Sequence, residues 1–336
     1  MTPIVTRAFA RAGLLGNPSD GYGGKTISLI VSNFWAEAIL TPSPILAIDM
    51  SDPFEQSFSS IAELRQHVVE HGYYGGERLV KAAIKRFADY CDGRHELTRP
   101  CFRIAIRSNI PLQVGLAGSS AIIIATLRGL MQWYEVTIPP YLLASLALSA
   151  ELDELGIPAG LQDRVVQAYE GIVYMDFARS AMKDEGGLVF GSYEPIELDS
   201  FPNFYISYST RGSEPTEVLH GDLKRRYQAG EPAVLQAMDQ WAEFAREGKD
   251  VLLRGDDVRL AELIDANFDL RRRMCRLNPH HVEMVETARG VGCSAKYCGS
   301  GGAILGTYFD EAMFNRLGKA LHSLGCHVFK PHLRPV

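Results

Sequence analysis

The stretch Ile-Pro-Leu-Gln-Val-Gly-Leu-Ala-Gly-Ser-Ser-Ala, residues 110–121, precedes an apolar run with the composition of a buried helix. Gly115 and Gly118 let the backbone approach an anion, because no Cβ stands in the way. Ser119 and Ser120 can cap the helix that we expect to begin directly after them. The backbone N–H groups and the dipole of such a helix start both favour negative charge. The stretch therefore predicts a phosphate-binding loop.

The spacing of these glycines differs from two common nucleotide-binding patterns. No Lys-Ser or Lys-Thr pair follows them, as a P-loop requires, and the stretch contains no Gly-x-Gly-x-x-Gly. A glycine-serine turn before a buried helix, without a ligand, is therefore the alternative interpretation. On this stretch alone both interpretations stay open.

The composition predicts a globular protein that acts on small molecules. A chain of 336 residues with 46% hydrophobic content is long enough for two domains. Its formal net charge of −6 disfavours non-specific nucleic-acid binding, which normally requires a basic surface. Neither a signal-peptide core nor an apolar run of membrane-spanning length is present, so we expect a cytoplasmic protein with no membrane partner.

The six cysteines are scattered along the chain, with neither Cys-x-x-Cys spacing nor histidine partners. This pattern argues against a zinc site and against a disulfide framework. We therefore expect reduced thiols that are mostly buried.

A glycine-rich stretch follows a short predicted strand at residues 8–10. Residues 11–26 contain five glycines and one proline, which predicts a loop. Arg11 and Asp20 could hold a sugar there, because a guanidinium donates hydrogen bonds and a carboxylate accepts them. The alternative is that Asp20 accepts hydrogen bonds from its own backbone in a turn.

The rest of the pattern predicts a mixture of strands and helices. We expect strands at residues 26–34, 36–40, 45–50, 102–107, 171–177 and 204–209, a hairpin within 186–199, and helices at 59–88 with a break near 72–76, at 141–155 and at 161–169. Residues 215–290 are almost entirely helical in pattern and residues 295–330 form a small α/β unit, with one apolar helix face made by Leu260, Leu263, Ile264 and Phe268.

Two charged features lie at helix ends. Asp163 falls in the first turn of the helix at 161–169, where an acid can simply complement the helix dipole. Arg271, Arg272 and Arg273 close a later helix, where a solvated helix end is the alternative to anion binding.

Three glycine-bearing stretches, taken in order, resemble the motifs of the GHMP kinases, the family of galactokinase, homoserine kinase, mevalonate kinase and phosphomevalonate kinase. These stretches are Arg-Ala-Gly-Leu-Leu-Gly-Asn-Pro-Ser-Asp at 11–20, the central loop at 111–121, and Lys-Tyr-Cys-Gly-Ser-Gly-Gly-Ala at 296–303. In the central loop, one more residue precedes the serine pair than in the commonest form of the motif. The resemblance therefore leaves open which serine holds a metal ion.

Within that family the sequence is especially similar to the glucuronokinase branch. The shared stretches are Gly-Asn-Pro-Ser-Asp at 16–20, Ala-Gly-Leu-Gln-Asp-Arg-Val at 159–165 and Asn-Phe-Asp-Leu-Arg-Arg-Arg-Met at 267–274. The resemblance implies an α+β chain with the two-domain GHMP kinase fold. Residues 1–210 would form an ATP-binding domain like domain 2 of ribosomal protein S5, and residues 211–336 a ferredoxin-like domain. The active site would lie in the cleft between them.

The resemblance also implies roles for individual residues. Gly115, Leu116, Ala117, Gly118, Ser119 and Ser120 would cradle the ATP phosphates. Ser119 or Ser120 would bind Mg²⁺ together with Glu151, which lies twelve positions before Asp163. Asp163 would be the catalytic base and Arg11 a cation beside the reacting hydroxyl. The substrate would be faced by Asn17, Asp20, Gly299, Ser300 and Gly301.

The activity that this resemblance implies is ATP-dependent phosphorylation of a sugar at its anomeric hydroxyl, with D-glucuronate as the expected substrate. Two alternatives stay open. One is a kinase of the same family for another sugar or small alcohol, such as galactose, a heptose or mevalonate. The other is a catalytically silent sensor of nucleotide and sugar, which the presence of Asp163, Glu151 and the serines disfavours.

Overall fold

A computed structural model describes residues 2–49, 56–73, 75–210 and 217–335. One long strand, β2 (Lys25–Pro42), organises the first half of the fold. Strand β1 (Ile4–Leu15) pairs with β2 along one edge, while β5 (Phe102–Ser108) and β6 (Ile172–Asp176) share its other edge. The sheet is completed by β3 (Leu46–Asp49), β4 (Gln56–Phe58) and β9 (Ser192–Pro195), in the order β4-β3-β5-β2-β6-β9. All its pairs are antiparallel except β3 with β5.

Two expectations about this sheet were wrong. The strands expected at 26–34 and 36–40 are one strand, because a bulge lets pairing with β1 resume after a shift: Ala10 faces Val31, and Phe9 faces Trp35. The loop expected from Arg11 begins only after Leu15, because residues 11–15 are buried and continue the ladder with β2. Tertiary pairing overrides the local glycine signal here.

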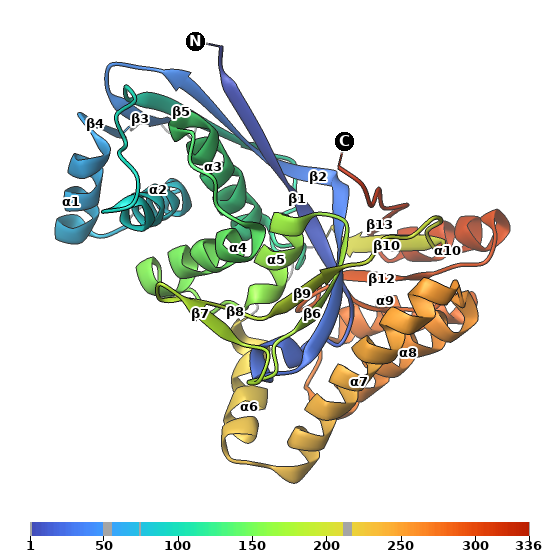
Figure 1. Ribbon diagram of the computed structural model, residues 1–336. Helices are drawn as coiled ribbons and strands as arrows, with labels where there is room; N and C mark the ends of the chain where they lie inside the picture. The colour runs from blue at the N-terminus through green and yellow to red at the C-terminus, as the bar shows by residue number, and fades with distance from the viewer. Residues whose placement is uncertain (1, 50–55, 74, 211–216, 336) are drawn as a thin grey trace.

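Helices cover one face of this sheet. They are α1 (Ile61–His71), α2 (Arg78–Cys91), α3 (Gly118–Tyr134), α4 (Pro140–Ser149), the π-helical turn η2 (Ala150–Glu154) and α5 (Leu161–Tyr169). Helix α3 packs along β1 and β2 (Figure 1). The expected break between α1 and α2 is confirmed. The expected hairpin, in contrast, lies earlier than predicted: β7 (Lys183–Glu185) and β8 (Leu188–Phe190) turn at Gly186-Gly187, and β9 joins the main sheet.

The second sheet is four-stranded and antiparallel, in the order β13-β10-β12-β11. Its strands are β10 (Phe204–Ser209), β11 (Lys296–Tyr297), β12 (Ala303–Thr307) and β13 (Cys326–Phe329). Helices α6 (Glu217–Gln228), α7 (Pro232–Arg254), α8 (Asp257–Met274) and α9 (Pro279–Gly290) connect β10 to β11, and α10 (Glu311–Ser323) connects β12 to β13. This strand order and connectivity are ferredoxin-like, as expected.

The largest hydrophobic cluster extends from the first half of the fold into the second, which also has two smaller clusters of its own. The cluster that fills the first sheet also includes Phe204 and Leu305 of the second sheet and the α8 residues Leu260, Leu263 and Ile264. Helix α7 packs directly on β2. The division expected after residue 210 stays a prediction, although β10, which lies before it, is paired within the second sheet.

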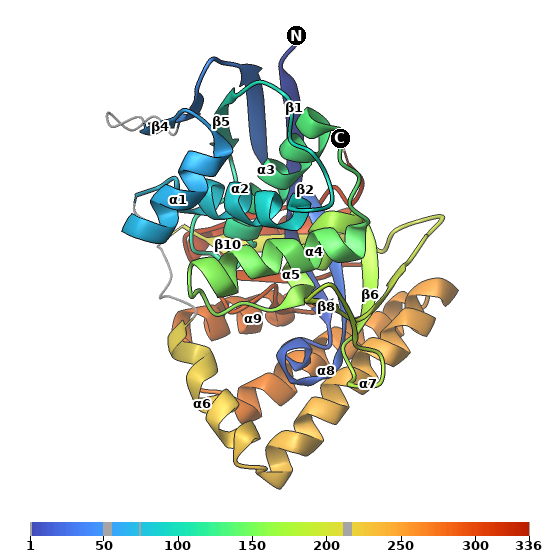
Figure 2. The same ribbon diagram turned by 60° about the vertical axis from the view of Figure 1, so that its left-hand side comes forward.

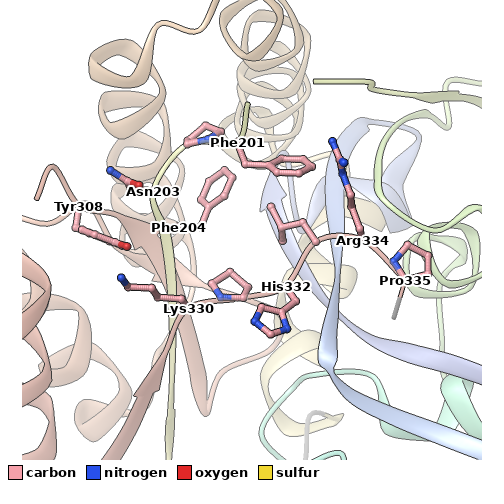
Figure 3. Close-up of a pocket in the computed structure, with 11 residues that line it drawn as sticks. Phe201, Asn203, Phe204, Tyr308, Lys330, His332, Arg334 and Pro335 are labelled. Atoms are coloured by element: carbon pink, nitrogen blue, oxygen red, sulfur yellow. The ribbon is translucent and has the colours of Figure 1, made fainter. Parts of the chain in front are cut away.

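The last residues of the chain return to the bulge of β2. The N–H of Ser32 donates to the carbonyl of His332 (2.9 Å), and its hydroxyl donates to the carbonyl of Arg334 (2.7 Å). A cavity of about 540 Å³ lies beside this segment, with Phe201, Tyr308 and Lys330 among its lining residues (Figure 3). None of the expected site residues lines this cavity.

The cysteines agree with the expectation of mostly buried thiols. All six cysteines are free, and Cys91, Cys293, Cys298 and Cys326 are buried. Among the described residues, no helix is long and apolar enough to cross a membrane.

Candidate functional site

Strand β1 carries Arg11 into the contact between the central loop and the turn that follows β11. The guanidinium Nη1 of Arg11 donates to the carbonyls of Gly115 (2.8 Å) and Cys298 (3.3 Å). Its backbone N–H donates to the carbonyl of Leu116 (3.2 Å). Arg11 is only 8% exposed. One buried cation therefore joins the three stretches that the sequence singled out.

The central loop and the turn after β11 touch backbone to backbone. Gly115 has a left-handed φ of +74°, and a Cβ at this position would lie 2.8 Å from the carbonyl oxygen of Gly301. A Cβ on Gly299 would lie 2.7 Å from the carbonyl oxygen of Gly115. Since real side chains do not approach so closely, both glycines are required by the packing.

Helix α3 begins earlier than expected. Its first residue is Gly118, and its N-cap is Ala117, in a left-handed conformation with φ 61° and no side-chain cap. Ser119 and Ser120 are therefore first-turn residues and not caps, which corrects the expectation. Because the first N–H groups of a helix have no partner within it, the loop still presents donors to an anion.

The two serines have different surroundings. The hydroxyl of Ser119 donates to Oε1 of Glu151 (2.9 Å). Ser120 is fully buried, and its hydroxyl donates to the carbonyl of Ala117 (3.2 Å). Of the two serines, only Ser119 has its hydroxyl hydrogen-bonded to a carboxylate.

Asp163 lies in the first turn of α5 and faces Arg11. The Nε of Arg11 donates to Oδ1 of Asp163 (2.6 Å), and Arg164 lies 3.5 Å from Oδ2. Burial by itself would raise the pKa of Asp163, but the charges of Arg11 and Arg164 outweigh it and lower the pKa. The carboxylate is therefore ionised near neutral pH, and its side chain remains 20% exposed.

Asp20 joins this group from the short 3₁₀ helix η1 (Ser19–Tyr22), which packs against α5 and α7 and lies close to α6 in Figure 2. A Cβ on Gly160, at the start of α5, would lie 2.9 Å from Oδ2 of Asp20. Burial and the nearby charge of Asp163 raise the pKa of Asp20 to about 6, although Arg11 offsets part of the effect. Its carboxylate also accepts hydrogen bonds from the backbone of Asp20 and Gly21, so the turn interpretation holds as well.

Asn17 is buried, and both its side-chain and its backbone oxygen accept hydrogen bonds. Its Oδ1 accepts a hydrogen bond from Nζ of Lys296 (2.7 Å), and its carbonyl accepts one from Asn267 (3.1 Å). Lys296 also donates to the carbonyls of Gly13 and Tyr297, and burial holds its pKa well below the ordinary value. Its role in fixing Asn17 was missed, although Lys296 opens the third motif.

Glu151 is held by a second residue that the sequence did not single out. Its Oε2 accepts a hydrogen bond from Nε of Arg164 (2.6 Å), and both side chains are buried. The available signal was a basic residue directly after Asp163 in the same helix.

The donor set around Glu151 fits a hard cation that keeps most of its water. No cluster of three or more His, Cys, Asp or Glu residues occurs in the described part of the chain. Mg²⁺, however, commonly uses one or two protein oxygens together with water and phosphate. The hydroxyl of Ser119 and Oε1 of Glu151 provide such a pair, while Oε2 is occupied by Arg164.

The arginine triplet divides into two kinds of residue. Arg272 pairs with Glu286 at the surface (2.6 Å), and Arg273 is exposed, as expected for a solvated helix end. Arg271 is 4% exposed, so it is not part of a solvated helix end, and anion binding is the interpretation that stays open for this residue. It is buried because its guanidinium turns back under Gly299, whose carbonyl accepts a hydrogen bond from Nη1 (2.7 Å).

Comparison with known proteins accounts for the three stretches together. The model for the N-terminal domain of GHMP kinases matches residues 78–171, which include the central loop, Glu151 and Asp163. Glucuronokinase 1 of Arabidopsis thaliana is 42% identical over 311 residues, covering 90% of this chain and 84% of the relative. Probable glucuronokinase 2 of the same plant is also 42% identical, covering 89% and 82%.

Solved structures agree on the fold. Galactokinase of Lactococcus lactis superposes with a TM-score of 0.81 at 15% identity, covering 99% of this chain and 94% of that chain. The two-domain α+β fold expected from the sequence is confirmed. With 42% identity over most of its length to plant glucuronokinases, this chain belongs to the GHMP kinase family.

Proposed function

We propose that this protein transfers the γ-phosphoryl group of ATP to the anomeric hydroxyl of D-glucuronate, giving the 1-phosphate. One observation carries the chemistry: the ionised carboxylate of Asp163 lies 2.6 Å from Arg11 at the foot of the central loop. The identity of 42% to a plant glucuronokinase supports the choice of sugar.

The central loop is the proposed binding site for the ATP phosphates. Residues 115–120 combine two glycines with the unpaired N–H groups of the first turn of α3. Phosphoryl transfer needs little covalent chemistry from a protein, so positioning and charge stabilisation provide most of the catalysis. Arg11 supplies a fixed positive charge at the base of this loop.

Asp163 is the proposed general base. As the sugar oxygen forms its bond to the γ-phosphorus, the bond from that phosphorus to the oxygen of ADP breaks, and the hydroxyl proton passes to Asp163. Its lowered pKa keeps the carboxylate free to accept this proton across the neutral range. The bond from Arg11 fixes the direction of the carboxylate.

Ser119 and Glu151 are the residues that would hold Mg²⁺, and Ser120 has a structural role. A bound Mg²⁺ would neutralise negative charge on the ATP phosphates. The proposal prefers Ser119 because its hydroxyl contacts Glu151, whereas the hydroxyl of Ser120 is buried against the loop backbone.

Asp20 and the turn at Gly299, Ser300 and Gly301 are the proposed sugar-binding residues. Asp20 lies next to the start of α5, and the turn packs against the central loop, so both border the reacting groups. Asn17 acts indirectly, because Lys296 and Asn267 fix it as a support for η1.

One experiment tests the proposal. ADP release is measured with a panel of uronic acids, neutral sugars, heptoses and mevalonate, and the products are identified by mass spectrometry. We expect the highest kcat/KM for glucuronate, with phosphate on the anomeric oxygen. Preference for another acceptor would favour a different kinase of the family, and nucleotide binding without turnover on any acceptor would favour a sensor.

A further inference from the structure

Arg271 differs from Arg11 and Arg164 because it is buried without a close ion pair among the described residues, although the charge of Asp20 reaches it. Arg11 pairs with Asp163, and Arg164 pairs with Glu151. Among the described residues, Arg271 forms no ion pair and is only 4% exposed. Burying a charge without a counter-ion costs free energy, so buried charges are usually paired with a group of opposite charge. An unpaired buried cation therefore indicates a site for an anion.

The guanidinium of Arg271 has N–H groups that the protein uses only weakly or not at all. Nη1 donates to the carbonyl of Gly299 (2.7 Å), and Nη2 makes only a long contact of 3.5 Å with the carbonyl of Ser300. Nε is buried and has no hydrogen-bond partner in the part of the chain that the structure describes. The group lies 5.4 Å from the centre of the Tyr297 ring, and the hydroxyl of Tyr297 is likewise buried without a partner.

The neighbouring cation cannot serve the same purpose. Lys296 is buried as well, but its ammonium group already donates to the carbonyls of Gly13 and Tyr297 and to Oδ1 of Asn17. An ammonium group has three donors, so none is left. Of these two side chains, only Arg271 has N–H groups left to bind a new anion.

The location of Arg271 connects it to the proposed reaction. Gly299, which Arg271 holds, would have its Cβ 3.0 Å from Nη1 of Arg11 and 2.7 Å from the carbonyl of Gly115. Arg271 thus supports one side of the turn, and the other side packs on the catalytic cation and the phosphate loop. Asp20 interacts electrostatically with both Asp163 and Arg271, so both charged groups lie near the same carboxylate.

We propose that Arg271 binds the carboxylate of the sugar acid and sets the preference for a uronic acid over an uncharged sugar. The inference rests on the proposed function, because it assigns the acidic end of that substrate. A planar guanidinium suits a carboxylate, since two parallel N–H groups can meet both oxygens. Substrate binding would complete the hydrogen bonds that Arg271 lacks.

The test compares glucuronate with glucuronamide, which has nearly the same shape but no charge. In the Arg271→Ala variant, kcat/KM for glucuronate should fall by about 10 to 150-fold, as expected for the loss of a hydrogen bond to a charged group, mainly through KM. The value for glucuronamide should change only a few-fold. Arg271→Lys keeps the positive charge but removes the planar pair of N–H groups. It should give an intermediate decrease in kcat/KM for glucuronate and no decrease for glucuronamide.

Arg272→Ala is the matched control, because Arg272 is exposed on the same helix turn and pairs only with Glu286. This variant should leave kcat/KM unchanged for both glucuronate and glucuronamide. If Arg271 merely supports the turn, Arg271→Ala will lower kcat/KM by the same factor for glucuronate and for glucuronamide. That result would overturn the inference. Should Arg271→Ala fail to fold, the substrate ratio in Arg271→Lys decides in the same way.

The same measurement separates this inference from the proposed function. If the wild-type protein phosphorylates glucuronate and the ratio of the two substrates is unchanged in both Arg271 variants, only the role of Arg271 fails. If the wild-type protein phosphorylates glucuronamide or a neutral sugar as well as glucuronate, the carboxylate has no binding partner and the inference also fails. If it does not phosphorylate glucuronate at all, the proposed function fails first.

Discussion

Replacement of Asp20 by Asn should make the protein more stable and less active. The carboxyl group titrates near 3.8 in an ordinary environment and near 6 in the folded protein, because burial and Asp163 disfavour its charge. A difference of about two pKa units corresponds to about 3 kcal/mol. This value is an upper limit, since the side chain is partly exposed. Asn removes the charge and can still accept a backbone hydrogen bond.

The gain in stability from Asp20→Asn should depend on pH. Below the unfolded pKa, Asp20 is protonated in both the folded and the unfolded state, so variant and wild type should have equal free energies of unfolding. Between pH 3.8 and 6 the unfolded chain is already ionised while the folded protein still holds the proton on Asp20, so the wild type loses stability relative to the variant as the pH rises through this range. The gain from Asp20→Asn should therefore be absent at about pH 3 and complete above about pH 7.

Urea unfolding at several pH values, followed by tryptophan fluorescence, measures this gain directly. The control is Asp239→Asn, which alters an exposed acid on α7 and should change little. In an Asp163→Asn background the gain should shrink, because one cause of the raised pKa is gone. kcat/KM should fall by about 10 to 150-fold if the carboxylate accepts a sugar hydroxyl. A variant that is less stable than the wild type at neutral pH would refute the reasoning.

Three other changes test the rest of the site. Asp163→Asn should lower kcat by about 10² to 10⁴-fold while ATP still binds in a calorimeter, and turnover within a few-fold of wild type would remove Asp163 from the mechanism. Ser119→Ala should lose activity that extra Mg²⁺ or Mn²⁺ partly restores, whereas Ser120→Ala should cost about 1 kcal/mol of stability whatever the metal, and identical responses would contradict the assignment. Gly299→Ala should reduce activity strongly, because its Cβ would lie 2.7 Å from the carbonyl of Gly115. Gly318→Ala, in open space on α10, should instead stabilise the protein by about 0.5 to 1 kcal/mol, and equal effects of the two changes would show that the turn tolerates a side chain.

Local sequence patterns were sufficient to predict the elements whose conformation depends mainly on their own residues. The break between α1 and α2, the helices of residues 217–290 and the terminal α/β unit follow from hydrophobic period and turn residues. The order of central loop, α3 and the helix bearing Asp163 also follows from the sequence. The resemblance to a kinase family then identified Arg11, Asp163 and Glu151 as neighbours of that loop.

Features that depend on distant partners could not be predicted in the same way. The glycines at 13 and 16 suggested a loop, but the chain stays extended until Leu15 because β2 pairs with it. Arg164 was overlooked because its partner, Glu151, lies on another helix. Arg271 could not be separated from Arg272 and Arg273, since only the packing of the turn at Gly299 shows which of the three is buried.

The hydrogen bonds of Arg11 determine when the site can first exist during synthesis. Its partners Gly115, Asp163 and Cys298 lie 104, 152 and 287 positions further along the chain. Contacts at such separations form late, because the closure of long loops must precede them. A nascent chain that has not yet emerged beyond Cys298 lacks part of this arrangement even if its first sheet has folded. Enzymatic activity in a translation reaction would therefore require synthesis beyond Cys298, and fragments released earlier would be inactive.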